Sequence, residues 1–135
     1  MKRIHHVFIF VAVVLCAAAI PAMAHHSFAS EFDVDKPITV SGVITQVRLE
    51  NPHSWFFLES TKADGKVEKW GFEASTPTSL IRSGVKPTFV KTGDKVTING
   101  WHARDASQNM GCARELILAD GRAFAIGPPV GAGGR

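Results

Sequence analysis

The chain has little excess of either charge and no apolar run long enough for a membrane span. Its 135 residues carry 15 Lys and Arg against 12 Asp and Glu, so it lacks the strong basic excess of a polyanion-binding surface. The apolar stretch at residues 7–19 falls short of the about 20 residues that a spanning helix needs. With 45% hydrophobic and 20% charged residues, the composition also excludes collagen-like, coiled-coil and wholly disordered chains and predicts one domain.

The first 24 residues have the layout of a secretory signal peptide. Lys2 and Arg3 form a positive start, the apolar stretch follows, and Pro21 precedes the small-x-small sequence AMA at 22–24. We therefore expect cleavage after this sequence, a periplasmic or secreted protein, and no stable membrane anchor after cleavage; an uncleaved anchor is the alternative. Losing Lys2 and Arg3 lowers the formal net charge from +3 to +1, which disfavours nucleic acid as a partner.

Cysteine is scarce. Cleavage would remove Cys16 and leave Cys112 as the single thiol, so no internal disulfide can stabilise the mature chain. Stability then has to come from a hydrophobic core, which a chain of this length is able to form.

Strand signals dominate the mature sequence after an N-terminal arm at 25–36, which we expect to be extended. Alternating apolar residues bounded by turn residues predict strands at 38–50, 54–59, 67–74, 95–102, 110–119 and 122–126. Gly42 lies where the first strand changes phase, so we expect a bulge there.

One helix is predicted, between the third and fourth strands. Thr76 is a capping residue, Pro77 suits the first helical position and Gly84 suits the end. This order of elements predicts an all-β fold, a small five- to six-stranded OB-like barrel over residues 37–126, followed by a disordered tail at 127–135. An open meander or sandwich is the alternative.

Five short motifs give the sequence a resemblance to a known family. They are HHSF at 25–28, NPH at 51–53, WGFE at 70–73, GDKV at 93–96 and DGR at 120–122. With these motifs, which extend over nearly the whole mature chain, the sequence resembles a family of small secreted bacterial proteins of unknown function. The resemblance implies export and a compact β domain, and it implies no activity.

Four histidines remain after cleavage: His25, His26, His53 and His102. Cleavage would make His25 the first residue, so its α-amine and imidazole can chelate one metal ion, with His26 as a further donor. His53 and His102 lie in two loops that border the same end of the predicted barrel, so we expect their imidazoles to lie close together. The alternatives are a solvated terminus and two separate, hydrogen-bonded histidines.

Met110 and Cys112 add two sulfur atoms on one face of the fifth strand, with Met110 expected opposite His102. A thioether and a thiolate together with imidazole favour Cu(I). The same face is expected to carry Val96 and Ile98, so filling of the core is the alternative role of both sulfur side chains.

The aromatic residues Trp55, Phe57, Trp70 and Phe72 lie on two neighbouring strands. Most are expected in the core, and one or two could form a stacking surface for a ligand. No phosphate-binding glycine loop, HExxH or GxSxG motif occurs, so we expect no enzyme and no catalytic residue. The sequence therefore predicts an exported, non-enzymatic binding module for a transition metal, copper in the first place, with a protein- or glycan-binding barrel as the alternative.

Overall fold

The computed structural model of the protein describes residues 28–128. The predicted signal peptide at 1–24, His25, His26 and residues 129–135 of the predicted tail lie outside this range. Within the range, no helix is long and apolar enough to cross a membrane.

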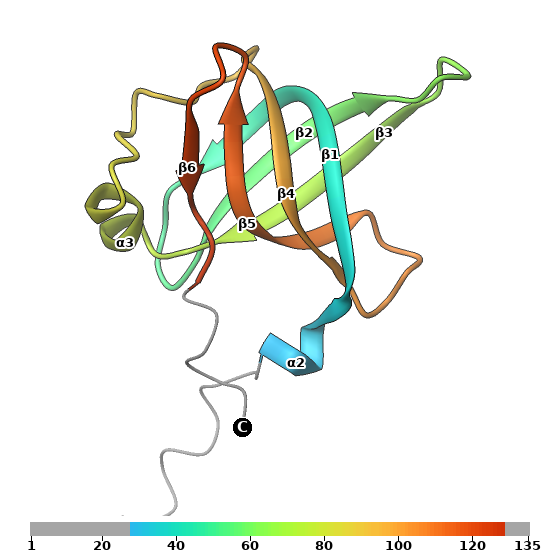
Figure 1. Cartoon of the computed structure of the whole chain (residues 1–135), viewed down its shortest axis with the longest axis horizontal. Helices are drawn as coiled ribbons and strands as arrows, with labels where there is room; N and C mark the ends of the chain where they lie inside the picture. The colour runs from blue at the N-terminus through green and yellow to red at the C-terminus, as the bar shows by residue number, and fades with distance from the viewer. Residues whose placement is uncertain (1–27, 129–135) are drawn as a thin grey trace, which may run out of the picture.

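Six strands form one sheet that curls into a ring (Figure 1). Along the chain the elements are α2 (Phe28–Glu31), β1 (Phe32–Arg48), β2 (Ser54–Thr61), β3 (Val67–Ala74), α3 (Pro77–Arg82), β4 (Lys95–Ala103), β5 (Met110–Leu118) and β6 (Ala123–Ala125). The strands follow the order β3-β2-β1-β4-β5-β6, and a parallel pairing of β3 with β5 joins five of them into a barrel-like ring. The predicted all-β fold, with a short helix between β3 and β4, is confirmed.

β1 bends so that its first half pairs with β4 and its second half pairs with β2. Gly42 lies at the bend, where a Cβ atom would clash with the carbonyl oxygen of Glu59, so the two backbones approach closely only because this residue is glycine. The bulge predicted at Gly42 is wrong in position. The register shifts later, between Ile44 and Gln46.

The ring encloses the hydrophobic core. Side chains alternate along each strand, and the inward set packs together with Leu80, which α3 contributes from beside the ring (Figure 1). The largest fully buried apolar side chains are Phe56, Phe72, Ile44, Leu58, Leu80, Ile98, Leu116 and Ile126.

The short helix α3 begins and ends as its sequence predicts. The side-chain oxygen of Thr76 accepts a hydrogen bond from the backbone N–H of Ser79 at 3.2 Å, and Pro77 occupies the first helical position. Gly84 follows the helix with φ of +90°, a conformation that side chains other than glycine rarely adopt.

The described part of the arm predicted at 25–36 is extended only from residue 32 on. Phe28–Glu31 form a helical turn, and β1 already begins at Phe32. The turn brings the rings of Phe28 and Phe32 together, with 5.4 Å between centroids, and sets Phe28 edge-on against Trp101, also at 5.4 Å. These aromatic contacts favour a packed segment over a solvated arm.

A buried hydroxyl provides a test of the core. Ser54 is 0% exposed, and its Oγ has no hydrogen-bond partner among residues 28–128. Because an unpaired buried hydroxyl is costly, Ser54→Ala should raise the free energy of unfolding by about 1 kcal/mol, measured by urea denaturation.

Ser83→Ala is the matched control, because the Ser83 hydroxyl does donate a hydrogen bond, to the carbonyl oxygen of Leu80 at 2.9 Å. This control should bring no gain in stability. A loss of stability in Ser54→Ala would contradict the prediction.

Candidate functional site

One row of side chains runs around the outside of the ring at a single level. Register pairs set its members side by side on successive strands, in the order Pro37, Trp101, Cys112, Glu73, Trp55 and Arg48. We call this set the outer row. Glu73 faces outward because its neighbours on β3, Phe72 and Ala74, are both buried in the core.

His53 lies over the outer row, in the loop between β1 and β2. Its Nδ1 contacts Oε1 of Glu73. The His53 side chain is 53% exposed and that of Glu73 is 13% exposed, so the imidazole lies at the surface with the carboxylate beneath it. Since Nδ1 is directed at Glu73, Nε2 is the ring nitrogen left for an external ligand.

The electrostatic surroundings of Glu73 favour a positive charge at this place. Burial is the main cause that raises the pKa of Glu73. The charge of His53 lowers this pKa, and the negative charge of Glu31 raises it. A cation beside the carboxylate would offset both the burial and the repulsion from Glu31.

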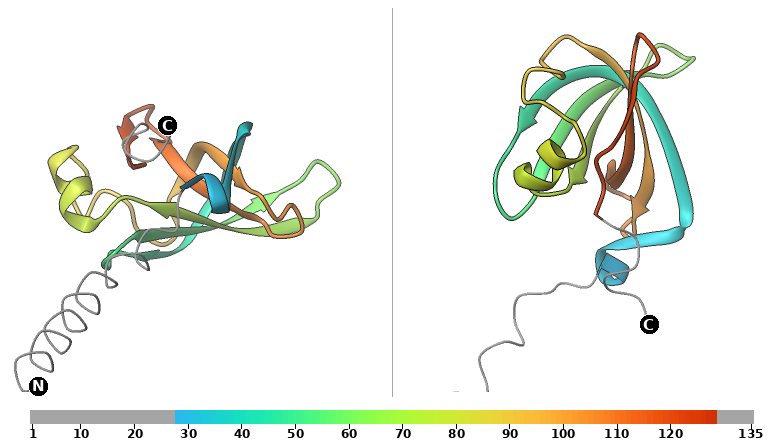
Figure 2. Two further views of the ribbon diagram at one scale, coloured as in Figure 1. Left: turned by 90° about the horizontal axis from the view of Figure 1, so that it is seen from below. Right: turned by 60° about the vertical axis from the view of Figure 1, so that its left-hand side comes forward.

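α2 and the loop after β4 border the same site. The backbone N–H of Arg104 donates a hydrogen bond to the carbonyl oxygen of Glu31 at 2.9 Å. The N–H of Gly71 on β3 donates to the carbonyl oxygen of Asn109 at 3.1 Å, which fixes the end of this loop beside β3. α2 therefore lies at the end of the ring where β1 begins and β4 ends (Figure 2).

Cys112 is covered although it belongs to the outer row. This free cysteine is 2% exposed. Burial raises the pKa of its thiol to about 12, and the negative charge of Glu73 adds to the rise. At neutral pH Cys112 is therefore a protonated thiol, and a metal ion that binds it would have to displace this proton.

The predicted approach of His53 to His102 is not seen. The His102 ring packs edge-on against Trp70, with 5.5 Å between centroids, and its Nδ1 lies 2.7 Å from the next carbonyl oxygen along the chain. Trp70 stacks on the buried ring of Phe72 and packs against the core, whereas Glu73 faces outward. The two histidines thus contact opposite faces of β3.

Met110 does not lie opposite His102. The residue paired with His102 is Gly111, and Met110 instead pairs with Gly71 on β3. The two sulfur side chains therefore do not flank the His102 imidazole as a pair.

A bulge in β5 turns the two sulfur side chains away from the core. Successive residues of β4 pair with Glu115 and then with Ala113, so Arg114 is the extra residue. The extra residue reverses which side chains face inward. Cys112 consequently lies outside the ring and not beside Ile98, as the strand pattern predicted.

The four aromatic candidates divide between the core and the surface. Phe72 is 0% exposed, and Trp70 packs against the core. Trp55 and Phe57 face outward with their rings stacked, 6.0 Å apart and 14° from parallel. The guanidinium of Arg48 lies over the Phe57 ring, 4.6 Å from its centroid, so much of the Phe57 ring is already engaged by its neighbours.

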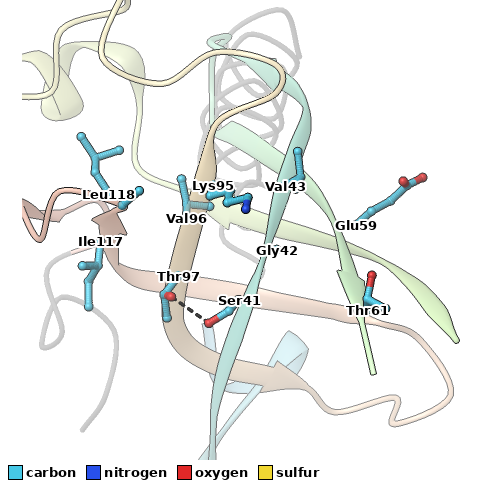
Figure 3. Close-up of a pocket in the computed structure, with 11 residues that line it drawn as sticks. Ser41, Gly42, Val43, Glu59, Thr61, Lys95, Val96, Thr97, Ile117 and Leu118 are labelled. Atoms are coloured by element: carbon cyan, nitrogen blue, oxygen red, sulfur yellow. Dashed lines mark hydrogen bonds between the residues drawn. The ribbon is translucent and has the colours of Figure 1, made fainter. Parts of the chain in front are cut away.

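A hollow of about 340 Å³ lies on a different part of the surface (Figure 3). Hydroxyl and aliphatic side chains line it together with two charged ones, Glu59 and Lys95. The hydroxyls of Ser41 and Thr97 share a hydrogen bond of 2.7 Å across β1 and β4. None of the site residues predicted from the sequence lines this hollow.

The residues from 28 to 128 contain no group of three or more His, Cys, Asp or Glu side chains placed to hold a metal ion. Of the two histidines in this range, His53 has a carboxylate partner, Glu73, and the Nδ1 of His102 lies beside a carbonyl oxygen.

Sequence reasoning missed the roles of Glu73 and Trp101. Glu73 has the pattern of a solvent-facing strand residue, and only the parallel pairing of β3 with β5 sets it beside Cys112. Trp101 directly precedes a candidate histidine, and its outward direction follows from the alternation of β4 with the buried Val96 and Ile98. That alternation is the signal in the sequence from which the outward direction of Trp101 could have been predicted.

Comparison with family models assigns the chain. The model of a family of unknown function, DUF6152, matches residues 12–112. The chain belongs to this family. The match confirms the resemblance to a family of unknown function, and the matched range contains every candidate metal-binding residue from His25 to Cys112. No curated protein matches the chain.

The raised pKa of Cys112 makes the stability of this DUF6152 protein depend on pH. A thiol whose pKa is 9.0 when unfolded and about 12 when folded keeps its proton in the folded state while the unfolded state loses it. Stability therefore falls as the pH rises above 9.0, and the contribution lost by about pH 10 is about 1.4 kcal/mol.

Cys112→Ala removes this contribution. Urea denaturation of both proteins at neutral pH and at about pH 10 should show a larger loss of stability in the wild type than in the variant. Equal losses in the two proteins would show that the thiol is not held in its protonated form.

Proposed function

We propose that this protein is an exported, non-enzymatic binding module for a transition metal ion, copper in the first place. Its ligands are the imidazole of His53 and nitrogen donors of His25 and His26. The proposal depends on one observation, the contact of His53 Nδ1 with the half-buried carboxylate of Glu73.

This contact has the form of the outer coordination shell of a metal site. A metal-binding histidine usually donates its second ring N–H to a carboxylate or carbonyl, which fixes the orientation of the ring and raises the basicity of the binding nitrogen. Glu73 lies under His53 in this way and leaves Nε2 toward the surface. Glu73 is thus a positioning residue, and the metal ion adds the positive charge that the buried carboxylate favours.

The proposal brings the N-terminal histidines to this site through the short stretch of chain that precedes Phe28. His25 precedes Phe28 by three residues, and an extended chain covers about 10 Å over that length. Phe28 packs on Trp101 of the outer row, and Glu31, at the other end of α2, acts electrostatically on Glu73. Cleavage after residue 24 would give His25 a free α-amine that titrates near about 8, so that a useful fraction binds metal at neutral pH.

The donor set supports Cu(II) over Cu(I). Imidazole and amine nitrogens suit Cu(II), whereas Cu(I) prefers thiolate and thioether ligands. Cys112 is 2% exposed and Met110 pairs with β3 away from His53. Neither sulfur side chain is therefore included in the proposed site.

Calorimetric titration of the processed protein with Cu(II) and Zn(II) tests the proposal. We expect a dissociation constant below about 10 μM, which corresponds to about 7 kcal/mol. His53→Ala and Glu73→Gln should each weaken binding by about ten-fold or more, the effect expected when a ligand or its carboxylate partner is removed. One residue added before His25 should weaken binding sharply, because it removes the free amine from the ligand set.

Two variants serve as matched controls. His102→Ala removes an imidazole that contacts Trp70 on the core side, and Glu115→Gln neutralises a carboxylate that accepts a hydrogen bond from Asn99 at 3.0 Å. Both should leave the metal affinity unchanged. Binding weaker than about 10 μM, or equal losses in His53→Ala and His102→Ala, would overturn the proposal.

A further inference from the structure

The hollow of about 340 Å³ lies where β1 and β2 separate (Figure 3). From Val43 onward β1 pairs with β2, with Val43 opposite Glu59, whereas the preceding part of β1 pairs with β4 alone among the described strands. The last residues of β2, Ser60 and Thr61, pair only with β3 within the same range. The hollow therefore lies beside strand edges that have no partner in residues 28–128.

Opposite charges flank the hollow. Val43 pairs with Glu59 on one side and with Lys95 on the other. The three side chains face outward, because Leu58 and Val96, the neighbours of the charged residues, are buried in the core. Since adjacent strands lie about 4.8 Å apart, about 10 Å separates the α-carbons of Glu59 and Lys95.

Both charges are available to a ligand. Lys95 forms no ion pair within residues 28–128. Glu59 has a long contact of 3.9 Å with Lys69, whose side chain is 85% exposed, and an exposed pair of this kind contributes little. Figure 3 shows Lys95 extending from β4 toward β1, with Glu59 at the opposite side of the hollow.

Hydroxyl and aliphatic groups lie next to the two charges. The hydroxyls of Ser41 and Thr97 share a hydrogen bond of 2.7 Å. Whichever of them donates, the accepting hydroxyl keeps its own hydrogen for a ligand. Val43 is 38% exposed, and Ile117 adds a second aliphatic surface. These groups suit a ligand with polar amide groups and small apolar side chains, and the unpaired strand edges offer further partners for peptide groups.

The two charges and their spacing select the class of ligand. A simple carboxylate would be attracted by Lys95 and repelled by Glu59, and a simple amine would meet the reverse. A zwitterion satisfies both residues. The amine and carboxylate of a free amino acid are attached to one carbon, whereas an extended peptide spans about 3.3–3.6 Å per residue, so that about three residues match a spacing of about 10 Å.

We propose that this hollow binds a short peptide of about three residues through its two free ends, with the α-amine at Glu59 and the terminal carboxylate at Lys95. The peptide lies over Val43 and reaches the hydroxyls of Ser41 and Thr97. The site shares no residue with the proposed metal site, so this inference does not rest on the proposed function.

Titration of the processed protein with trialanine, followed by NMR chemical shifts, tests the inference. We expect a dissociation constant below about 1 mM. Acetylation of the peptide amine and amidation of its carboxylate each remove one charge and should each weaken binding by about ten-fold or more. Free alanine should also bind about ten-fold more weakly than trialanine, because it cannot reach both charged residues.

Paired changes in protein and peptide test which end lies where. Glu59→Gln and Lys95→Met should each weaken trialanine binding by about ten-fold. In Glu59→Gln, acetylation should bring little further loss while amidation still weakens binding, and Lys95→Met should show the reverse, because each change removes one partner of the same contact.

The same substitutions elsewhere on the surface are the matched controls. Glu50→Gln changes a carboxylate beside Arg48, and Lys86→Met changes an ammonium group over the Phe89 ring. Neither residue lines the hollow, so both variants should bind trialanine as the wild type does. Unchanged amide shifts away from the substituted residue show that each variant is folded.

Three results would contradict the inference. One is the absence of trialanine binding at about 10 mM, ten times the expected limit. Another is equal affinity for trialanine and for free alanine, which would exclude recognition of two separated ends. The third is a loss on acetylation that is as large in Glu59→Gln as in the wild type, because the amine would then not lie at Glu59.

Discussion

The parallel pairing of β3 with β5 is the contact on which both the ring and the outer row depend. It joins β3 directly to β5 in a sheet whose order otherwise runs from β3 to β5 through β2, β1 and β4. In an open sheet, Glu73 and Cys112 would therefore be separated by three strands. Parallel strands cannot be joined by a tight turn, so the whole stretch of α3, its following loop and β4 serves to bring these two residues together.

Small residues make this closure possible. A Cβ atom at Gly111 would lie 2.7 Å from the carbonyl oxygen of Trp101 and 2.9 Å from the Phe72 ring. At Gly71 a Cβ atom would lie 3.2 Å from the outward ring of Phe57. Glycine at these positions lets the backbone and the aromatic rings approach each other closely on both faces of the β3–β5 pair. The aromatic side chains that fill the core and cover the surface can therefore be large.

The strands and α3 could be predicted from the sequence, whereas the arrangement of side chains in the site depends on how the strands pair. Turn residues and alternation gave the strands, and Thr76 with Pro77 predicted α3, because these signals act within a few residues. The inward direction of His102 was also present in its alternation with Val96 and Ile98. The contact of His53 with Glu73 was not predicted, because it depends on the register between β2 and β3, in which Trp55 pairs with Glu73.

The bulge at Arg114 shows how little sequence change separates two different surfaces. One additional residue in β5 decides whether the side chains of Met110 and Cys112, or the small residues Gly111 and Ala113, face out of the ring. Loss of that residue would exchange the two sets without altering the identity of any other side chain. The chemical character of the outward face of β5 is therefore set by the length of the strand. Deletion of one residue would change this face more than several point substitutions would.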